Sequence, residues 1–329
     1  MTESIPPSCN VIQRYPQNPI LSAADIPYHA TLIFNAGVAR AGGRYAMVFR
    51  NDYGDAQEKR LQGTNLGLAF SDDGLHWTAN AEPCFVMETD EIRRAYDPRL
   101  TVVDGRCYMC FAVDTRHGVR GGIAAIDDRW QHFEVLSLSA PDNRNMVLFP
   151  EKVGGKFARL ERPFPIYGRG APEAFDIWFS DSSDLAYWGN AQLVLGSEQV
   201  AFCNSKIGPA APPVKTEKGW LALFHAVDKD PDRVLKGWEG NWKKRYTVGL
   251  MLLDLKNPAQ VIGLCPEPVM VPEARYPYEV DGFRGSVLFP TGMILEEDGQ
   301  VKIYYGASDT VMALATAHVD DLIALCEPI

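Results

Sequence analysis

Short apolar segments rich in Val, Ile, Phe, Tyr and Trp recur along the whole chain, and Gly, Asp or Asn bounds each of them. This pattern predicts β-strands separated by turns. Helical periodicity is scarce, and the best short helix candidate covers residues 320–325. The proline-rich segments 163–172 and 209–213 are predicted to be ordered loops between strands. No linker or long charge run divides the sequence, so we expect an all-β fold in a single domain, 1–329.

One combination of turn and strand occurs five times. The copies, each a glycine-containing turn followed by an apolar strand, cover residues 41–50, 103–113, 153–163, 217–227 and 297–307. Their turn glycines lie between 50 and 80 residues apart and are Gly43, Gly105, Gly155, Gly219 and Gly299. A second repeat, a strand followed by an acidic turn and an aromatic residue, covers 69–77, 124–133 and 178–188.

An all-strand repeat with this period is typical of four-stranded blades arranged around an axis. Five copies therefore predict a five-bladed β-propeller. The alternative is a large β-sandwich or mixed β protein whose hairpins share only their turn chemistry.

The charge balance limits the partners that we expect. The chain has 329 residues, with 32 Lys and Arg against 42 Asp and Glu, which gives a formal net charge of −10. This acidity argues against nucleic acid or an anionic membrane as a partner, although a local cluster of cations could still bind a small anion. No segment predicts a signal peptide or a transmembrane helix. Seven cysteines without a dense framework suit a cytoplasmic location.

Several familiar motifs are incomplete or absent in this sequence and predict no site. Cys107 and Cys110 have metal-site spacing, but they lie in a predicted strand where positions i and i+3 face opposite sides, so core thiols are expected. A calcium-loop pattern at 228–239 has Arg233 where the turn needs glycine. No Walker A, dinucleotide, zinc-peptidase or serine-hydrolase motif is present. Nucleotide-driven, zinc-peptidase and serine-hydrolase chemistries therefore lose their usual support.

Polar residues stand at equivalent ends of the repeated strands. Arg50 and Asn51 end the first, Arg162 the third and His225 the fourth, and Asp309 closely follows the fifth. A propeller would collect these side chains in one axial pocket. Each of them alone is more often a surface or turn residue.

Three further segments carry polar groups of the same kind. They are 96–99 with Tyr96 and Asp97, 143–145 with Arg144 and Asn145, and 204–206 with Lys206. An acid that faces several cations suits attack by an anion on an uncharged substrate. The arginines and the lysine would hold phosphate, and Asp97 would protonate the leaving group.

These residues lie in blocks that resemble glycoside hydrolase family 130, whose members are mostly inverting mannoside phosphorylases on a five-bladed propeller. The blocks follow the family order and are YDPRL (96–100), NRNMVLFPEK (143–152), RLERP (159–163), NSKIGPAAPP (204–213), LFHAVD (223–228), KGWEGNW (236–242), MLLDLKNP (251–258) and YYGASDT (304–310). They look most like the subgroup that phosphorolyses 4-O-β-D-mannosyl-D-glucose. One departure is residues 281–286, which read DGFRGS where many members read GDVPN, in a loop that we expect at the acceptor subsite.

The resemblance implies a role for each matching residue. Asp97 would be the general acid, acting on the glycosidic oxygen through the mannose 3-hydroxyl. The phosphate-binding residues would be Arg144, Asn145, Arg162, Lys206, His225 and Tyr246. The residues that bind the sugar would be Asn35, Arg50, Asn51, Tyr96 and Asp309.

The expected reaction converts mannosyl-glucose and inorganic phosphate reversibly into α-D-mannose 1-phosphate and glucose. Phosphate is then a substrate, and no cofactor is needed. The alternatives are phosphorolysis of β-1,4-mannooligosaccharides or of a mannosyl-N-acetylglucosamine linkage, a mannoside hydrolase, and a sugar-binding propeller without activity. The sequence leaves the acceptor sugar and the formation of homo-oligomers open.

Overall fold

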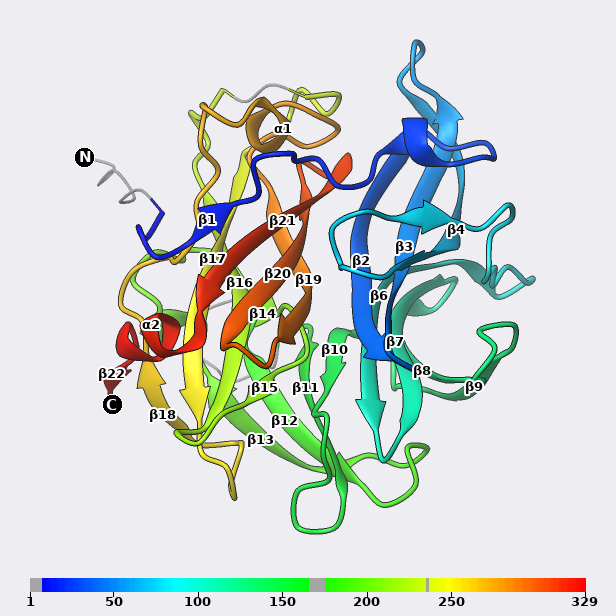
Figure 1. The fold of residues 1–329 in the computed structure, drawn as a ribbon. Coiled ribbons are helices and arrows are strands. Elements are labelled where there is room, and N and C mark those ends of the chain that lie inside the picture. Colours follow the sequence, from blue (N-terminus) through cyan, green and yellow to red (C-terminus); the bar gives the residue numbers. More distant parts are fainter. Residues whose placement is uncertain (1–7, 166–174, 235–236) are drawn as a thin grey trace.

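The strands form five antiparallel sheets within the residues that the structure describes, and these sheets follow one another around an axis in chain order (Figure 1). The structure is a computed structural model that describes residues 8–165, 175–234 and 237–329. Part of the proline-rich segment 163–172 and Lys236 of the KGWEGNW block fall outside the described residues. The fold is the five-bladed β-propeller that the repeat predicts.

Each blade takes its strands from one stretch of chain, apart from two additions at the chain ends. The first blade contains β2 (Leu32–Ala41), β3 (Arg44–Asp55), β4 (Arg60–Ser71) and β5 (Thr78–Ala79). The second contains β6 (Ile92–Val103), β7 (Arg106–Thr115), β8 (Gly118–Ile126) and β9 (Phe133–Leu138). The third contains β10 (Asn143–Leu148), β11 (Phe157–Pro163), β12 (Ile177–Ser182) and β13 (Gly189–Leu195). The fourth contains β14 (Lys206–Pro209), β15 (Val214–Lys215), β16 (Trp220–Lys229), β17 (Lys244–Leu253), β18 (Val261–Leu264) and the C-terminal β22 (Glu327–Pro328). The fifth contains β19 (Leu288–Leu295), β20 (Gln300–Ala307), β21 (Val311–His318) and the N-terminal β1 (Gln13–Arg14).

The repeated strand is the one that pairs with the innermost strand of its blade, and these strands are β3, β7, β11, β16 and β20. The turn glycine before each of them has a positive φ, which glycine adopts without steric cost. The acidic turns of the second repeat follow the third strand of their blades. There Asp73 Oδ1 accepts the N–H groups of Leu75 and His76 at 2.8 and 2.9 Å. Asp184 Oδ1 likewise accepts the N–H groups of the two residues after Leu185, at 2.9 Å each.

The N-terminal strand closes the ring, a feature that the hydrophobic pattern did not predict. Gln13 and Arg14 pair with β21 and complete the fifth blade (Figure 1). Arg14 is buried, and its Nε donates to Glu279 Oε1 at 3.0 Å. Glu279 lies in the short helix α1 (Pro277–Val280), so this ion pair fixes the first blade-forming residues to the loop that leads into β19.

Five hydrophobic clusters fill the described core, one at each junction between neighbouring blades. A blade is therefore apolar on both faces. In β7, Cys107 and Met109 pack toward the first blade, whereas Tyr108 and Cys110 pack toward the third. This confirms that the two cysteines are core thiols on opposite faces of a strand, and burial raises the pKa of each to about 12.

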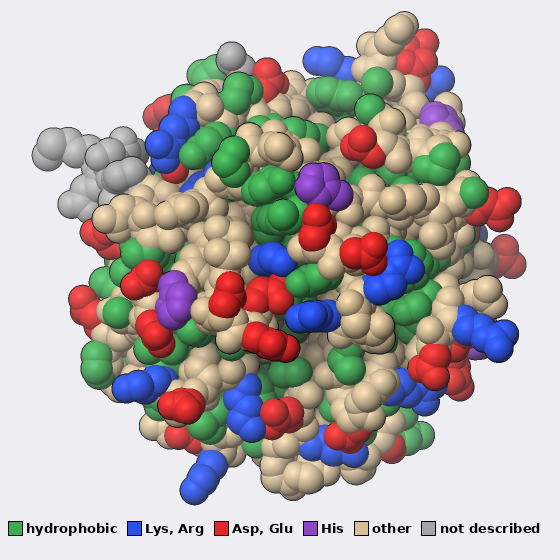
Figure 2. Space-filling model, in the orientation of Figure 1, with side chains coloured by type: hydrophobic (Ala, Val, Ile, Leu, Met, Phe, Trp, Pro, Cys, Tyr) green, Lys and Arg blue, Asp and Glu red, His purple; other side chains and the backbone are tan. Residues whose placement is uncertain are grey.

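The surface elements are few and short. Helix α2 (Val319–Ala324) confirms the predicted C-terminal helix, and two 3-10 turns cover Ala23–Asp25 and Ser197–Gln199. Among the described helices, none has the length and apolar character needed to cross a membrane. On the face that Figure 2 shows, basic side chains are interspersed with acidic ones and form no large basic patch.

Candidate active site

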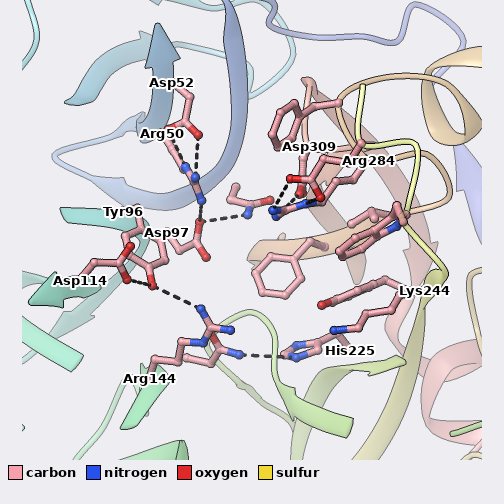
Figure 3. A pocket seen from close by; sticks show the side chains of 18 of the residues that line it. Arg50, Asp52, Tyr96, Asp97, Asp114, Arg144, His225, Lys244, Arg284 and Asp309 are labelled. Atoms are coloured by element: carbon pink, nitrogen blue, oxygen red, sulfur yellow. Dashed lines mark hydrogen bonds and ion pairs between the residues drawn. The ribbon is translucent and has the colours of Figure 1, made fainter. Parts of the chain in front are cut away.

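A pocket of about 510 Å³ opens where the innermost strands begin and the repeated strands end. Its lining comes from all five blades, because each blade contributes to one end of the axis. Most of the side chains that sequence analysis singled out point into it: Asn35, Arg50, Tyr96, Asp97, Arg144, Asn145, Arg162, Lys206, His225, Tyr246 and Asp309. Figure 3 shows Arg50, Asp97, Arg284 and Asp309 in the upper part of the pocket, above Arg144 and His225.

Three of these side chains are aimed by the same backbone feature. Asn35, Asp97 and Asn145 stand in the innermost strands of the first three blades, each within a break in strand register. Their φ angles are 49°, 54° and 59°, in the left-handed region that Asn and Asp tolerate better than other non-glycine residues. A bulge redirects a side chain out of the alternating pattern. The repeated use of Asn or Asp at this position therefore turns three polar groups toward the axis.

Carboxylates and their partners occupy one side of the pocket. Asp97 Oδ1 accepts hydrogen bonds from Asn35 Nδ2 and Arg50 Nη1, both at 3.0 Å. Arg50 also forms a bidentate pair with Asp52, at 2.8 and 2.6 Å. We call Arg50, Asp52, Asp97, Arg284 and Asp309 the carboxylate side of the pocket.

Opposite charges decide the protonation states on the carboxylate side. Burial disfavours a charged Asp97, but Arg50, Arg99 and the Asn35 hydrogen bond outweigh burial and lower its pKa. Burial also disfavours the Arg50 cation, and the charges of Asp52 and Asp97 outweigh it and raise the pKa of Arg50. Asp97 is therefore a carboxylate at neutral pH while the pocket holds no ligand.

Asp309 behaves differently from Asp97 on the same side. Its Oδ2 accepts from Arg284 Nη1 at 3.2 Å, and Arg284 also forms a bidentate pair with Glu239, at 3.0 Å for each bond. Burial nevertheless raises the pKa of Asp309 above its usual range. Arg284 is shared with Glu239, so its guanidinium compensates the charge of Asp309 incompletely.

The opposite side of the pocket is built from cations. We call Arg162, Lys206, His225 and Lys244 the cation side, and Arg144 lies between the two sides, where its Nη1 donates to Tyr96 Oη at 3.3 Å. Within the described ranges, none of Arg144, Arg162, Lys206 and Lys244 forms an ion pair. Two nitrogens of Arg162, Nε and Nη2, are buried without a hydrogen-bond partner.

His225 is held in its neutral form between these cations. Its Nε2 lies 3.3 Å from Arg162 Nη1 and 3.5 Å from Asn145 Nδ2. A guanidinium can only donate, so Nε2 accepts and the proton of the neutral ring is on Nδ1. Burial and the charge of Arg162 lower the pKa of His225 well below 6.5, in agreement with this tautomer.

The cations around the neutral His225 also destabilise one another. Burial, followed by the charge of Arg144, lowers the pKa of Arg162 to about 9. Burial and the charges of Arg162 and Arg144 lower the pKa of Lys206 well below 10.5. Buried cations that repel one another and keep donors free form a site that an anion would stabilise.

Comparison with known proteins identifies the family of this chain. The sequence model of the glycoside hydrolase family 130 β-1,4-mannooligosaccharide phosphorylases matches residues 12–328. The chain belongs to glycoside hydrolase family 130. The match and the relatives support phosphorylase activity on mannosides.

The relatives of this family 130 protein differ in the linkage and acceptor that their names give. It is 30% identical to the β-1,4-mannooligosaccharide phosphorylase of Ruminococcus albus, over 97% of this chain and 92% of the relative. It is 29% identical to the 4-O-β-D-mannosyl-D-glucose phosphorylase of Bacteroides fragilis, over 94% and 78%. The structure of the β-1,2-mannobiose phosphorylase from Listeria innocua, in complex with β-1,2-mannobiose, superimposes with a TM-score of 0.80 at 25% identity, covering 95% and 98%. Family membership thus leaves the acceptor undecided.

The structure corrects the placement of one expected sugar-binding residue. Asn51 does not line the pocket, because it follows Arg50 in a regular strand and its side chain points to the opposite face. It is fully buried, and its Nδ2 donates to the His29 carbonyl at 3.0 Å and to Asn65 Oδ1 at 3.1 Å. Asn51 therefore joins neighbouring segments of the first blade instead of facing the axis.

Other pocket residues of this family 130 protein escaped sequence analysis. Lys244 and Tyr246 are two positions apart in β17 and face the same side, so strand alternation from Tyr246 could have identified Lys244. Arg284 and Phe283 come from the divergent loop 281–286, which confirms that this loop reaches the pocket. Arg284 packs over the ring of Trp242, 4.9 Å from its centroid, and only tertiary contacts reveal that pairing.

In the part of the chain that the structure describes, no group of three or more His, Cys, Asp or Glu side chains is placed so that it could hold a metal ion. All seven cysteines are free. The donors gathered in the pocket are instead mainly nitrogens of Arg, Lys and Asn, which bind anions and hydroxyl groups.

Proposed function

We propose that this protein transfers a mannosyl group from a β-mannoside to inorganic phosphate with inversion, and that Asp97 is the general acid. A phosphate oxygen forms a bond to the mannosyl anomeric carbon while the glycosidic bond on the opposite face breaks. The products are α-D-mannose 1-phosphate and the released acceptor, and the reaction is reversible. The observation that carries this proposal is the cation side, whose buried nitrogens lack anionic partners within the described residues.

The pairing of the carboxylates argues against hydrolysis. An inverting hydrolase needs a second carboxylate that activates water, about 6.5–9.5 Å from the acid. The other pocket carboxylates, Asp52, Asp114, Asp309 and Glu239, each form an ion pair with an arginine. A phosphorylase needs no such base, because phosphate is already an anionic nucleophile.

The proton route requires a change at Asp97 on binding. Its pKa is lowered in the empty pocket, yet a general acid must carry the proton in the reactive complex. A bound phosphate adds negative charge nearby, and sugar hydroxyls compete with Arg50 for Oδ1, so both raise the pKa of Asp97. The proton then passes through the mannose 3-hydroxyl to the glycosidic oxygen.

The sugar would lie on the carboxylate side, against Asn35, Arg50, Tyr96 and Asp309. Trp242 and Phe283 line the same pocket and offer apolar faces to an acceptor ring. We propose 4-O-β-D-mannosyl-D-glucose as the first substrate, on the resemblance of the sequence blocks. The second candidate, a β-1,4-mannooligosaccharide, is favoured by the family match and by the Ruminococcus albus relative.

One assay tests the reaction. The protein is incubated with mannosyl-glucose, β-1,4-mannobiose or β-1,4-mannosyl-N-acetylglucosamine, with and without phosphate, and the products are followed by phosphorus NMR and sugar chromatography. We expect mannose 1-phosphate only when phosphate is present. Release of free mannose without phosphate would show a hydrolase, and binding without turnover would show a sugar-binding propeller.

The expectations about cellular location and partners stay predictions. A cytoplasmic location rests on the cysteine content, and the absence of nucleic acid and membrane partners rests on the net charge of −10. Homo-oligomer formation stays open.

A further inference from the structure

The hydroxyl of Tyr96 links a carboxylate in the wall of the active-site pocket to an arginine beside the cation side. Tyr96 Oη donates to Asp114 Oδ1 at 2.8 Å, and it accepts from Arg144 Nη1 at 3.3 Å. Tyr96 is 3% exposed, and Figure 3 shows the three side chains following one another along the pocket. Because a phenol hydroxyl has only one proton, donation to Asp114 leaves its lone pairs for Arg144.

Strand pairing in the second blade holds Asp114 at this place. Arg94 and Asp114 are directly opposite in the β6–β7 register, and Tyr96 lies on the same face of β6 as Arg94. Arg94 Nε donates to Asp114 Oδ2 at 2.7 Å, which leaves Oδ1 for the Tyr96 hydroxyl. The guanidinium of Arg94 also packs over the Tyr96 ring, 4.8 Å from its centroid. Asp114 is therefore fixed by its neighbours, and it fixes the direction of the Tyr96 hydroxyl in turn.

Arg144 depends on this hydroxyl because it faces a like charge. It is directly opposite Arg162 in the β10–β11 register, and like charges at opposite positions of a strand pair repel each other. Among the described residues, Arg144 has no carboxylate partner, and its Nε is buried without a hydrogen-bond partner. Within the same ranges, the Tyr96 hydroxyl is the one hydrogen-bond partner of its side chain.

The two opposed arginines differ as this contact predicts. Burial disfavours the charged form of both side chains. The contact with Tyr96 outweighs burial for Arg144 and raises its pKa, whereas burial and the charge of Arg144 lower the pKa of Arg162 to about 9. Arg144 therefore stays charged in the empty pocket, and its remaining N–H groups are available to an anion on the cation side.

We propose that Asp114 is a positioning residue for the phosphate nucleophile: through the Tyr96 hydroxyl, it holds Arg144 with its remaining N–H groups directed at the anion. This inference rests on the proposed function and deepens it. The ring of Tyr96 still borders the sugar, while its hydroxyl serves the phosphate. Because Tyr96 directly precedes Asp97, the same segment of β6 carries the acid and the group that fixes a phosphate ligand.

One substitution separates positioning from charge by the sign of its effect. Asp114→Asn removes a negative charge from the pocket, which by itself would strengthen the binding of an anion. The new amide can also donate to Tyr96, so that the hydroxyl proton turns toward Arg144 and repels it. In titration calorimetry with inorganic phosphate, we therefore expect Kd to rise about fivefold. An equal or lower Kd would overturn the role of Asp114.

Glu239→Gln is the matched control. It removes the same charge from another pocket carboxylate, whose partner is Arg284 and not Tyr96. We expect its Kd for phosphate to be unchanged or lower, and a rise as large as that of Asp114→Asn would refute the proposal. The side chains of Asp114 and Arg94 are both partly exposed, so loss of their ion pair should leave the protein folded.

A double variant tests whether Asp114 acts through Tyr96. In a Tyr96→Phe background, Asp114→Asn should change the phosphate Kd by less than about twofold, because the hydroxyl is already absent. The full effect in that background would show an independent role and overturn the proposal. In turnover of mannosyl-glucose, Asp114→Asn should raise KM for phosphate about fivefold and KM for the mannoside by less than about twofold. The reverse pattern would place Asp114 at the sugar and contradict the proposal.

Calorimetry with phosphate alone keeps this inference distinct from the proposed reaction. If the wild-type protein binds phosphate but phosphorolyses no mannoside, the proposed function fails, and the phosphate Kd values of the variants still decide the role of Asp114. If the protein phosphorolyses a mannoside and Asp114→Asn leaves both Kd and KM for phosphate unchanged, only the positioning role is refuted. A wild-type protein that binds no phosphate would refute both.

Discussion

The two sides of the pocket contain the same residue type in opposite electrostatic situations. Arg50 and Arg162 are both buried, at 8% and 1% exposure. Arg50 contacts two carboxylates, which raise its pKa, whereas burial and the neighbouring Arg144 lower the pKa of Arg162 to about 9. The charge of Arg50 is therefore balanced in the empty protein, whereas the charge of Arg162 is balanced only when an anion binds. Buried charges that lack partners mark the ligand site, and paired ones position it.

The largest expected effect is on the acid of the carboxylate side. Asp97→Asn keeps an oxygen that can accept from Asn35 and Arg50, but it removes the proton. We expect kcat to fall about 10²–10⁴-fold. Phosphate affinity, measured by calorimetry, should not fall, because Asp97 does not belong to the cation side and its negative charge opposes the anion. Turnover within tenfold of wild type would exclude Asp97 as the acid.

Removal of the paired Arg50 should lower the free energy of unfolding more than the other substitutions. Arg50→Met leaves the buried carboxylates of Asp52 and Asp97 without their cation. We expect the free energy of unfolding in urea to fall by about 3–5 kcal/mol at pH 7. A loss below about 1 kcal/mol would show that this pair does not hold the carboxylate side together.

The same substitution on the cation side should have the opposite effect on the free energy of unfolding. Arg162→Met removes an unpaired buried charge, so in phosphate-free buffer we expect unchanged stability or a gain of about 1–2 kcal/mol. KM for phosphate should rise about 10–100-fold, because charge-assisted hydrogen bonds are lost. A variant as unstable as Arg50→Met would contradict the distinction between the two sides.

Anion binding to the cation side should depend on pH. Burial and nearby cations hold the pKa of Lys206 well below 10.5, so its ammonium form is disfavoured in the empty pocket. A bound anion favours that form, and binding should therefore take up protons and weaken as pH rises through the pKa of Lys206. Calorimetry with sulfate, which does not titrate in this range, in two buffers of different ionisation enthalpy measures this uptake. The Lys206→Met variant should lose the buffer dependence.

The smallest effect is expected at the edge of the cation side. Lys244 is half-buried, and its Nζ lies 5.7 Å from the centroid of the Trp242 ring. Lys244→Gln should raise KM for phosphate about fivefold and change kcat little. Lys229→Gln is the matched control, because Lys229 faces Lys244 across the strand pair and does not line the pocket. Similar kinetics for both variants would remove Lys244 from the cation side.

The parts of the site that the sequence predicted are those that follow from the turn and strand repeat. The turn and strand repeat places Arg50, Arg162, His225 and Asp309 at equivalent ends, and all four line the pocket. The prediction for Asn51 was wrong because neighbouring residues in a strand face opposite sides. Arg50 and Asn51 therefore cannot both face the axis. Lys244 follows from alternation along β17, whereas Arg284 comes from a loop that has no equivalent in the repeat.

By itself, the sequence determined the five blades, because each repeat encodes a hairpin whose two apolar faces must pack against neighbours. It also predicted most of the polar residues that meet at the axis, although not Lys244 or Arg284. Only the tertiary structure decided which charges are paired, since the contacts that set them join residues far apart in the chain: Asn35 with Asp97, Asn145 with His225, and Arg162 with His225. Closure by β1 is equally non-local, because its partner β21 lies at the other end of the sequence. Short-range pattern fixes elements, whereas pKa values and free donors depend on the complete set of neighbours.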